Sequence, residues 1–559
     1  MAPTSFRSLL IRTFTLMVAL LCLAAPSLFS QETRSMIFGR VTDPSGSSIT
    51  GAKVVTRNLE NGAVTTLETN STGYYEANLL LPGSYEVDVE ANGFKKAARK
   101  GIQLQIGSRV EIDHKLEMGQ MTETISVTAE APLLETNAVS SGRVMDNRTV
   151  MDLPVMGNSV MLLLRQSAGM QTGGVNNELG LHSIAGGSDY GTSGNVGGNM
   201  WMMDGVPNQG SNRRAAMLPY SDTVAEFRLE TSNFDASVGQ TTGAVISMTS
   251  KSGSNSAHGT ATWQHWQRRW NGTPFFVKQL YFRRINEALA AGNTARANEL
   301  RGQDRQPTGR SNNWAATFGG PVVIPKLFNG KNKLFFFFSY NAFKDVKTED
   351  ASSINRTIPT SAQRNGDFSQ LLTVPNNPVQ FQLHDPLSVR PDPARAGQFI
   401  RDPFAGNIVP RNRIQNPMAA AYLRLLPNAN NDNANPESRN NYLAVGTPYN
   451  WDYWAYTNRV DYNISDRHRV FGRWSWNDFR EDRGDWTYES ARGLHTNGLN
   501  RNNKGASVDY VWTPAANTIL NFSGGINQFR EGDRITVPYQ FKPTSVGLPH
   551  YMDTFACSQ

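Results

Sequence analysis

Alternation of apolar and polar residues is the dominant pattern in the second half of the chain. Over residues 455–477, Val460, Tyr462 and Ile464 fall on one face of an expected strand, and residues 465–468 then form a short polar turn. Strands that are apolar outside and polar inside, with aromatic ends, are typical of transmembrane β-barrels. The apolar pattern recurs at Val470, Gly472, Trp474 and Trp476, across 335–340, and at Leu520, Phe522, Gly524 and Ile526. The opposite faces carry Arg459, Asp461, Asn463, Arg469, Arg473 and Ser475.

Residues 34–118 predict a small β-sandwich. Short apolar segments at 38–42 and 51–56 are separated by Pro and Gly turns, and an aromatic segment follows the turn at 70–73. In 85–90 apolar and acidic residues alternate strictly, which predicts a half-buried strand. The acidic face of this strand is either a calcium site or a solvated sheet face, and the solvated face is the simpler interpretation.

The middle of the chain, 133–258, mixes helix and strand signals. A short amphipathic helix is expected at 160–164, with its N-cap at 158–159 and a breaker at Gly169. Residues 172–200 are rich in Gly, Asn and Ser but contain no phosphate-binding glycine motif, so a flexible loop is expected. Strands are predicted within 201–207, 225–230 and 243–249.

The first 30 residues have the three parts of a secretory signal. Two arginines precede an apolar core at 16–25, and small residues follow, with cleavage expected after Ala25 or Ser30. A short membrane anchor is the alternative, although the apolar core is too short to span a bilayer comfortably. Lipidation of Cys22 is disfavoured by the bulky Leu21 before it.

Composition narrows the function classes. The 559 residues are enough for three or four domains. Cys22 and Cys557 are the only cysteines, which excludes a disulfide scaffold and a four-cysteine zinc site. The net charge is +7, but the basic residues are scattered, so a nucleic-acid surface is not indicated. No apolar run of 18 residues is present, which excludes a helical membrane protein but leaves a β-barrel open.

Catalytic chemistry is not indicated by any motif. The chain contains no convincing zinc-protease, serine-hydrolase or paired Cys/His pattern, and its carboxylates show no pairing in sequence. We therefore expect a protein that is not an enzyme and that has no cofactor, no catalytic residue and no metal ligand.

The N-terminal segment resembles the carboxypeptidase regulatory-like domain, a carbohydrate-binding-like β-sandwich. The resemblance covers about 80 residues and implies no catalysis. It rests on elements of the G-x-V-x-D-P-x-G, G-A-x-V, T-G-x-Y and L-P-G-x-Y-x-V types, at 39–46, 51–54, 72–75 and 81–87.

A possible coupling segment follows at 119–132. On pattern alone it is an exposed extended strand, a template for pairing with a partner strand. It resembles a TonB box, through which an energised inner-membrane complex pulls outer-membrane receptors, and the resemblance implies a periplasmic TonB-type partner. The last strand of the sandwich or a plain linker are the alternatives. The residues concerned are Glu123, Thr124, Ile125, Ser126, Val127, Thr128 and Ala129.

Residues 133–258 resemble the plug domain of TonB-dependent receptors, although Ala244 replaces a glycine that many members have. A lone His258 has no partner at ligand spacing, so a turn hydrogen bond at the plug–barrel junction is expected rather than a metal site. The motif positions are Asp204, Gly205, Pro207, Gly239, Gly243, Lys251, Gly253 and His258.

A long Asn-, Pro- and Asp-rich stretch at 358–450 contains the elements Gly366-Asp367-Phe368-Ser369, Asp385-Pro386, 404–410 and Arg413-Ile414. These elements resemble the Oar-like subgroup of these receptors, and since long loops of outer-membrane barrels face outside, this stretch is expected outside the cell. We count about eight to ten strands in 259–559, whereas plugged transporters have about 22, so an incomplete barrel and a C-terminally truncated chain are expected.

The sequence thus predicts a mainly β protein: a β-sandwich, an α+β plug, and part of an antiparallel transmembrane β-barrel in the outer membrane. The expected function is TonB-dependent import of an extracellular siderophore, oligosaccharide or peptide. A surface adhesin or carbohydrate-binding protein that transports nothing is the alternative.

Overall fold

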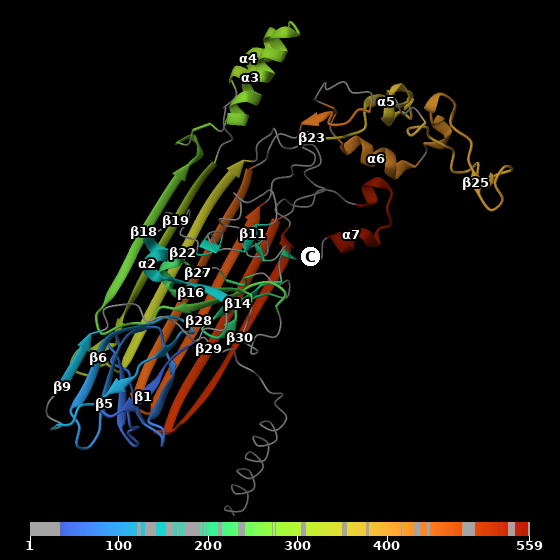
Figure 1. Ribbon diagram of the computed structural model, residues 1–559. Coiled ribbons are helices and arrows are strands. Elements are labelled where there is room, and N and C mark those ends of the chain that lie inside the picture. Colours follow the sequence, from blue (N-terminus) through green and yellow to red (C-terminus); the bar gives the residue numbers. More distant parts are fainter. Residues whose placement is uncertain are drawn as a thin grey trace, which may run out of the picture.

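The computed structural model places three regions in sequence order (Figure 1). A small β-sandwich lies at one end of a tall curved sheet, and an inner domain, residues 141–258, packs on the concave face of that sheet. The expected signal segment lies outside the described residues. The structure describes residues 34–119, 124–128, 141–152, 160, 163–164, 167, 169–172, 190–192, 195–196, 198–210, 215–217, 219–232, 241–270, 272–273, 275–302, 309–348, 355–375, 379–414, 416–426, 428–429, 437–443, 448–482, 498–534 and 543–556.

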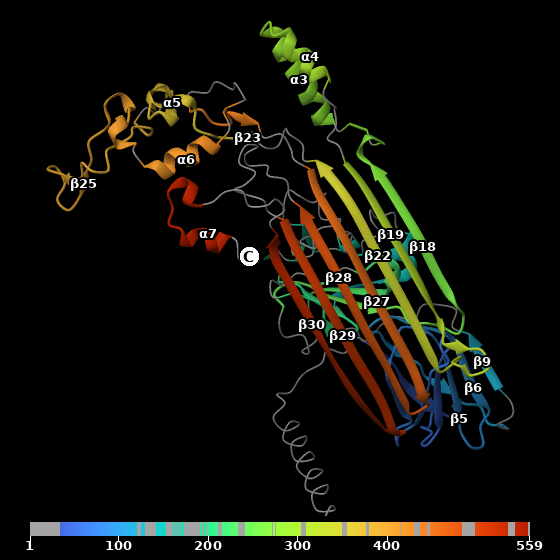
Figure 2. The same cartoon turned by 180° about the vertical axis from the view of Figure 1, so that it is seen from behind.

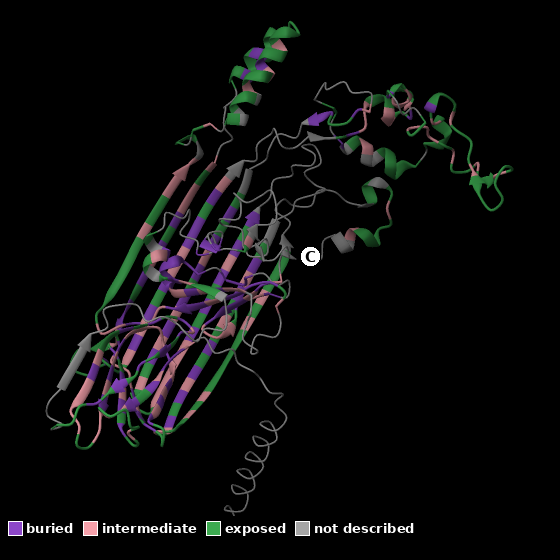
Figure 3. Cartoon of the chain, in the orientation of Figure 1, coloured by how far each residue is buried: buried purple, intermediate pink, exposed green. Residues whose placement is uncertain are grey.

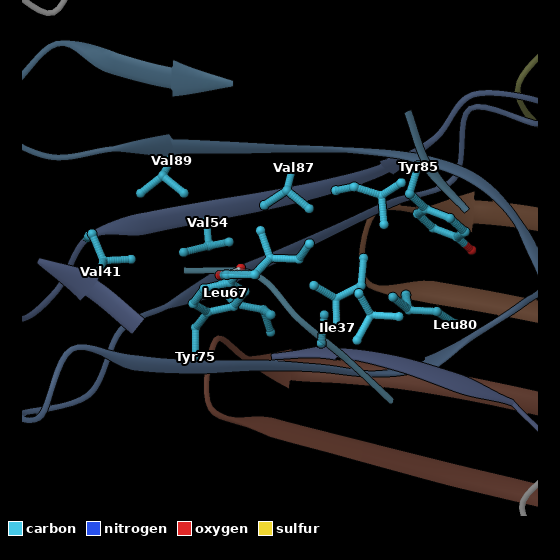
Figure 4. Close-up of a cluster of buried hydrophobic side chains, with 14 of the residues drawn as sticks. Ile37, Val41, Val54, Leu67, Tyr75, Leu80, Tyr85, Val87 and Val89 are labelled. Atoms are coloured by element: carbon cyan, nitrogen blue, oxygen red, sulfur yellow. Dashed lines mark hydrogen bonds between the residues drawn. The ribbon is translucent and has the colours of Figure 1, made fainter. Parts of the chain in front are cut away.

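The sandwich consists of two sheets packed face to face. Strand alternation drives this packing, because every second side chain of each strand points between the sheets. Tyr85, Val87 and Val89 are at most 3% exposed, as the sequence predicts, and Ile37 and Val54 pack against them (Figure 4). One sheet contains β1 (Ser35–Thr42), β4 (Tyr74–Leu80), β7 (Arg109–Glu111) and β8 (His114–Lys115). The other has the order β3 (Val64–Glu68), β2 (Lys53–Asn58), β5 (Gly83–Glu90), β6 (Lys96–Leu104) and β9 (Thr124–Thr128).

The inner domain is built on a five-stranded sheet with the order β10-β16-β17-β14-β15. Trp201, Phe227 and Ile246 are fully buried in its core, and the expected strands at 201–207, 225–230 and 243–249 are present. Its elements are β10 (Ser141–Asp146), α2 (Asn147–Asp152), β11 (Met170–Thr172), β12 (Tyr190–Thr192), β13 (Asn195–Val196), β14 (Met200–Met203), β15 (Val206–Pro207), η5 (Ser221–Thr223), β16 (Val224–Ser232) and β17 (Val245–Ser250).

The expected helix at 160–164 is only partly described. Val160, Leu163 and Leu164 are buried in the inner core, and the predicted breaker Gly169 has a φ of 83°. The predicted N-cap at 158–159 lies outside the described residues, and α2 was not expected from the sequence.

The curved sheet is an antiparallel meander of seven long strands (Figure 2). The strands pair in the order β18-β19-β22-β27-β28-β29-β30, so β18 and β30 form the open edges of the sheet. The expected hairpin is present, with its turn between Ser465 and His468. The described residues contribute seven long strands to this sheet, against the eight to ten strands expected for 259–559, and the described parts of 271–308 and 349–447 form helices and short strands. The seven are β18 (His258–Gln267), β19 (Gly309–Pro321), β22 (Leu334–Thr348), β27 (Pro448–Ser465), β28 (His468–Asp482), β29 (Gly498–Ala515) and β30 (Thr518–Arg534).

The two ends of the curved sheet differ. Short turns connect its strands beside the sandwich, whereas the long connections extend from the opposite end (Figure 1). Short strands pair near the turns as β20 (Val323–Ile324) with β21 (Phe328–Asn329), and at the loop end as β23 (Asn355–Arg356) with β26 (Tyr442–Leu443) and β24 (Arg390–Pro391) with β25 (Phe399–Ile400).

Helices occupy much of the loop end. In α6, Asn416 caps the N-terminus by accepting hydrogen bonds from the backbone N–H groups of Met418 and Ala419. Ile285, Ala297 and Leu300 hold α3 and α4 together. No helix in the described ranges is long and apolar enough to span a bilayer. The helices are η6 (Arg268–Trp270), α3 (Phe275–Ala290), α4 (Thr294–Gly302), α5 (Ser361–Arg364), η8 (Ser369–Thr373), η9 (Ala405–Asn407), η10 (Arg411–Arg413), α6 (Pro417–Leu425), η12 (Pro543–Val546) and α7 (Tyr551–Ala556).

Candidate functional site

A tight turn between β14 and β15 presents Asp204 to the wall of the curved sheet. Asp204 and Gly205 both have positive φ, 50° and 76°, a conformation that Asp tolerates and Gly adopts freely. The Asp204 carboxylate accepts hydrogen bonds of 2.8 Å from both the backbone N–H and the hydroxyl of Ser250 on the neighbouring β17. The turn therefore holds the carboxylate in a fixed orientation, and the following Pro207 is exposed.

Two arginines of the curved sheet face this carboxylate. Arg473 Nε lies 2.7 Å from Asp204 Oδ2, and Arg459 Nη1 lies 3.3 Å from Asp204 Oδ1. Arg459 also contacts Asp461, two residues along the same strand, at 2.8 Å. We call Asp204, Ser250, Arg459, Asp461 and Arg473 the boundary cluster. Its two arginines and two aspartates balance in charge, and none of these four side chains is more than 9% exposed.

The boundary cluster also joins the inner domain to the sheet through neutral groups. Arg459 Nη1 donates to the Ser250 backbone oxygen at 3.2 Å, and Arg473 Nη2 donates to the Met203 backbone oxygen at 3.3 Å. The Ser252 hydroxyl donates to Asp461 at 2.8 Å. Hydrogen bonds to the charged groups offset part of the cost of burying them.

A second polar contact lies around Asp222 in η5. Lys251 forms an ion pair with one carboxylate oxygen, and the hydroxyls of Thr260 and Thr317 donate to the other at 2.6 Å each. Burial alone raises the pKa of the Asp222 carboxyl, but the hydrogen bonds from Lys251, Thr260 and Thr317 outweigh it and lower the pKa. Asp222 is therefore held as a carboxylate at the junction of the inner domain with β18 and β19.

The sandwich contacts the inner domain through Ile106. Its backbone N–H donates to the carboxyl group of Glu226, and its backbone oxygen accepts a 3.0 Å hydrogen bond from Arg228. Burial raises the pKa of Glu226 to about 8. Arg34, at the start of the sandwich, forms a 2.8 Å ion pair with Asp509 of the sheet wall.

The remaining plug-motif residues have structural positions. Gly253 lies where the chain crosses the sheet, because a Cβ atom there would come within 2.5 Å of the Phe336 backbone oxygen. Gly243 is buried beside β17. The His258 ring Nδ1 lies 2.9 Å from the Ser256 backbone oxygen, a contact of the kind that the sequence predicts for this turn. Gly239 lies outside the described residues.

The expected coupling segment forms an edge strand of the sandwich. Residues 124–128 make up β9, which pairs in parallel with β6 from Lys96 to Lys100. This is the geometry of the alternative that the sequence left open, a last strand of the sandwich. In the described sheet no further strand pairs with the outer edge of β9. Glu123 and Ala129 lie outside the described residues.

The acidic face of β5 is neutralised by lysines of β6. Lys96 lies 2.9 Å from Asp88 and 3.2 Å from Glu90, and Lys100 lies 3.3 Å from Glu86. These ion pairs favour the solvated sheet face over a calcium site. Among the described residues no cluster of three or more His, Cys, Asp or Glu residues has metal-binding geometry.

A cavity of about 460 Å³ opens in the loop end. Ile358, Phe368, Val409 and Ile414 line it with apolar surface, beside Arg364. Arg364 is already engaged, since its Nη1 donates to two backbone oxygens of the α6 region at 2.9 and 3.0 Å. The cavity is therefore mainly an apolar surface within the Oar-like stretch.

The sequence predicts on which face of their strands the charged residues of the boundary cluster lie, but not which residues they contact. Arg459, Asp461 and Arg473 were expected on the polar face of their strands, but nothing in the pattern assigned them to Asp204. The signal for this contact is that three charged residues occupy inward positions of the β27–β28 hairpin. A charge that is buried inside a plugged barrel needs a partner of opposite charge.

Comparison with known proteins gives two family matches. Residues 249–557 match the Outer membrane beta barrel domain, and residues 36–117 match the Carboxypeptidase regulatory-like domain. The chain is 24% identical over 334 residues to the TonB-dependent transporter Oar of Myxococcus xanthus, a match that covers 57% of this chain. It spans 28% of the length of that curated relative.

Solved structures show a weaker likeness. The outer membrane transporter YddB from Escherichia coli gives a TM-score of 0.38 at 10% identity, covering 69% of this chain and 38% of YddB. The ferric enterobactin receptor PfeA from Pseudomonas aeruginosa gives 0.33 at 9% identity, covering 71% of this chain and 46% of PfeA. Both TM-scores lie below 0.5, so neither structure informs the function.

The fold and the boundary cluster define a mainly β outer-membrane protein. A β-sandwich precedes a barrel sheet, and the domain that covers the inner face of this sheet is held to it by ion pairs and hydrogen bonds. The barrel match covers more than half of the chain, so the chain belongs to the outer membrane β-barrel domain family. The resemblance to Oar-like TonB-dependent receptors and the outer-membrane location expected from the sequence are confirmed. The similarity is to a transporter, in agreement with the expectation of a protein that is not an enzyme.

Proposed function

We propose that the chain carries the sandwich (34–118), coupling segment (119–132), plug (133–258) and part of the barrel (259–559) of a TonB-dependent outer-membrane receptor. The inner domain is the plug, and the receptor imports an extracellular ligand. The boundary cluster is the observation that carries this proposal. A domain whose function was to seal a lumen permanently would be joined to the wall by apolar packing, because such packing costs no charge burial.

The polar boundary suits a plug that moves. Hydrogen bonds and ion pairs can be exchanged for water when the plug shifts, whereas separating an apolar interface exposes apolar surface at about 25 cal/mol per Å². The contacts made by Asp204 and Asp222 are of this exchangeable kind. They hold the plug at rest and leave it releasable by force.

The edge position of β9 suits pairing with a TonB-type protein. An unpaired strand edge presents backbone N–H and C=O groups that a partner strand can bind by β-augmentation. Because β9 pairs with β6, a partner strand added at its outer edge extends the sheet of the sandwich. Since the sandwich is bonded to the plug through Ile106, pulling on β9 transmits force to the plug.

The test is capture of the receptor by the purified periplasmic domain of a TonB-type protein. Successive backbone N–H groups point to opposite sides of a strand, so Ser126→Pro and Val127→Pro together cover both sides. At least one of them should lower capture by about ten-fold, because proline removes a ladder hydrogen bond. Ser126→Ala and Val127→Ala keep the backbone donor and should bind as the unaltered chain does.

Undiminished capture by both proline variants would overturn the coupling assignment. The alternative, a surface adhesin, predicts ligand binding at the cell surface that does not depend on the proton gradient. The receptor predicts accumulation of a ligand that stops when the gradient is collapsed.

A further inference from the structure

Among the described side chains, the lipid-facing surface of the barrel sheet carries its charges only toward the loop end. On the seven long strands, outward positions nearer the short turns contain no Asp, Glu, Lys or Arg, and aromatic and aliphatic side chains dominate there. Figure 3 shows how buried and exposed residues alternate along these strands. Among the side chains that the structure describes, the outward cations near the loop end are Arg310, Lys344, Arg480, Lys504 and Arg530.

These five cations lie at one height although they come from five different strands. The strands are staggered, so height is counted from the short-turn end of each. All five lie ten to twelve residues from the short-turn end of their strand. On β19 and β29, Arg310 lies eleven residues before Pro321 and Lys504 lies eleven residues before Ala515. On β22, β28 and β30, Lys344 lies ten residues after Leu334, Arg480 lies twelve residues after His468, and Arg530 lies twelve residues after Thr518.

This height matches the outer margin of a bilayer. Ten to twelve residues at about 3.3 Å each, on strands tilted by about 40°, rise roughly 25–30 Å, and the apolar band of an outer-membrane barrel is about 25 Å tall. Tyr456 and Trp476, whose rings lie on the outward face, stand just below the cations. Trp454 also lies on this face, eleven residues before Ser465, so the aromatic girdle overlaps the lower edge of the level at which the cations lie.

The charges of the belt are only partly balanced by the protein. Arg480 pairs with Asp478 at 2.9 Å and Lys344 lies 3.8 Å from Asp452. Lys504 lies over the Trp476 ring at 4.9 Å, which orients the ammonium without neutralising it. Arg310 and Arg530 are exposed. Among the described side chains, two carboxylates against five cations leave this level net positive.

We propose that these five residues, the basic belt, bind the phosphate groups of the phosphorylated glycolipid in the outer leaflet. Lys and Arg are the side chains that bind phosphate by charge-assisted hydrogen bonds. The acyl chains of the same lipid lie along the apolar band below, where Trp474 and Val508 are exposed. The belt fixes the depth of the barrel in the membrane and is independent of transport.

The test compares lipid retained by the purified chain in detergent. The probes are bis-phosphorylated lipid A, the same lipid without its phosphates, and inorganic phosphate. Changing Arg310, Lys344, Lys504 and Arg530 together to Gln should lower retention of phosphorylated lipid A at least about ten-fold, since each cation near a lipid surface contributes a several-fold effect. A charge-matched control changes Lys326, Lys331, Arg395 and Arg467 to Gln, all exposed and outside the belt, and should retain the lipid fully.

Comparing the three probes on the unaltered chain tests the proposal even if the fourfold variant folds poorly. The unaltered chain should retain phosphorylated lipid A and release its dephosphorylated form, and excess inorganic phosphate should not displace the lipid. Equal retention of both lipid forms, or full retention by a folded belt variant, would overturn the proposal. Displacement by inorganic phosphate would overturn it too, by showing a site for free anions.

Discussion

Arg473 Nε and Asp204 Oδ2 lie 2.7 Å apart across the boundary between the plug and the barrel wall, although the two residues are far apart in sequence. Their side chains are 5% and 2% exposed. A buried ion pair contributes little net stability, but removing one partner leaves an uncompensated charge in a medium of low polarity. The pair is therefore a sensitive point at which to test how the plug is held.

Asp204→Ala should loosen the plug. It leaves Arg473 without its carboxylate partner and removes the acceptor for both Ser250 hydrogen bonds. The expected cost is about 3–5 kcal/mol, the usual range for breaking a buried pair. The measurement is the urea midpoint of the purified protein in detergent, together with the rate at which a protease cleaves residues 141–258.

Asp466→Ala is the control, because Asp466 lies exposed in the short turn between β27 and β28. It should change neither the midpoint nor the cleavage rate. An Asp204→Ala protein as resistant as the unaltered chain would show that the boundary cluster does not hold the plug.

Gly253→Ala should destabilise the place where the chain passes from the plug to the wall. A Cβ atom at this position would come within 2.5 Å of the Phe336 backbone oxygen and 2.7 Å of the Gly320 backbone oxygen. Backbone atoms of a paired sheet cannot move aside cheaply, so we expect a loss of about 1–3 kcal/mol in the free energy of unfolding. Gly524→Ala is the matched control, since its Cβ would meet nothing within 4 Å, and equal midpoints for the two variants would contradict the steric account.

The contact between sandwich and plug should weaken as the pH rises. Burial raises the pKa of Glu226 to about 8, above the value of about 4.3 for an exposed Glu. Between these two pKa values the docked state therefore binds more protons than the undocked state. The stabilisation of the docked state by the raised pKa is complete below about pH 4.3 and is lost as the pH rises through about 8. Hydrogen exchange at the Ile106 amide should accelerate between pH 5 and pH 9 beyond the intrinsic rate increase.

Glu226→Gln cannot ionise and should abolish this extra acceleration, while Asp152→Asn, which changes an exposed carboxylate, should retain it. If the unaltered chain and Glu226→Gln gave the same pH profile, Glu226 would not be the titrating group.

Local patterns predicted the strands well and the joints between domains poorly. The alternation at 460–476 fixed the pairing of β27 with β28, because strand period and a short turn determine register. The partners of Asp204 come from strands far along the chain, and no local pattern encodes such a contact. The helices α3 and α4 were missed because their packing rests on one small contact set at Ile285, Ala297 and Leu300.

The lipid-facing band can be tested by placing one charge at two heights on β29. Val508 is 57% exposed and lies seven residues before Ala515, within the apolar band, whereas Asn502 lies on the same face beside Arg530 of the basic belt. Val508→Arg should cost about 2–4 kcal/mol and Asn502→Arg only about 0–1 kcal/mol, because the cost of a cation on the lipid face falls from the midplane to the interface. The measurement is urea-dependent unfolding from phospholipid vesicles, compared with the same variants in detergent micelles. The difference should shrink in micelles, which adapt to a charge more readily than a bilayer does. Equal costs at both positions in vesicles would show that this face of β29 does not contact the hydrocarbon core.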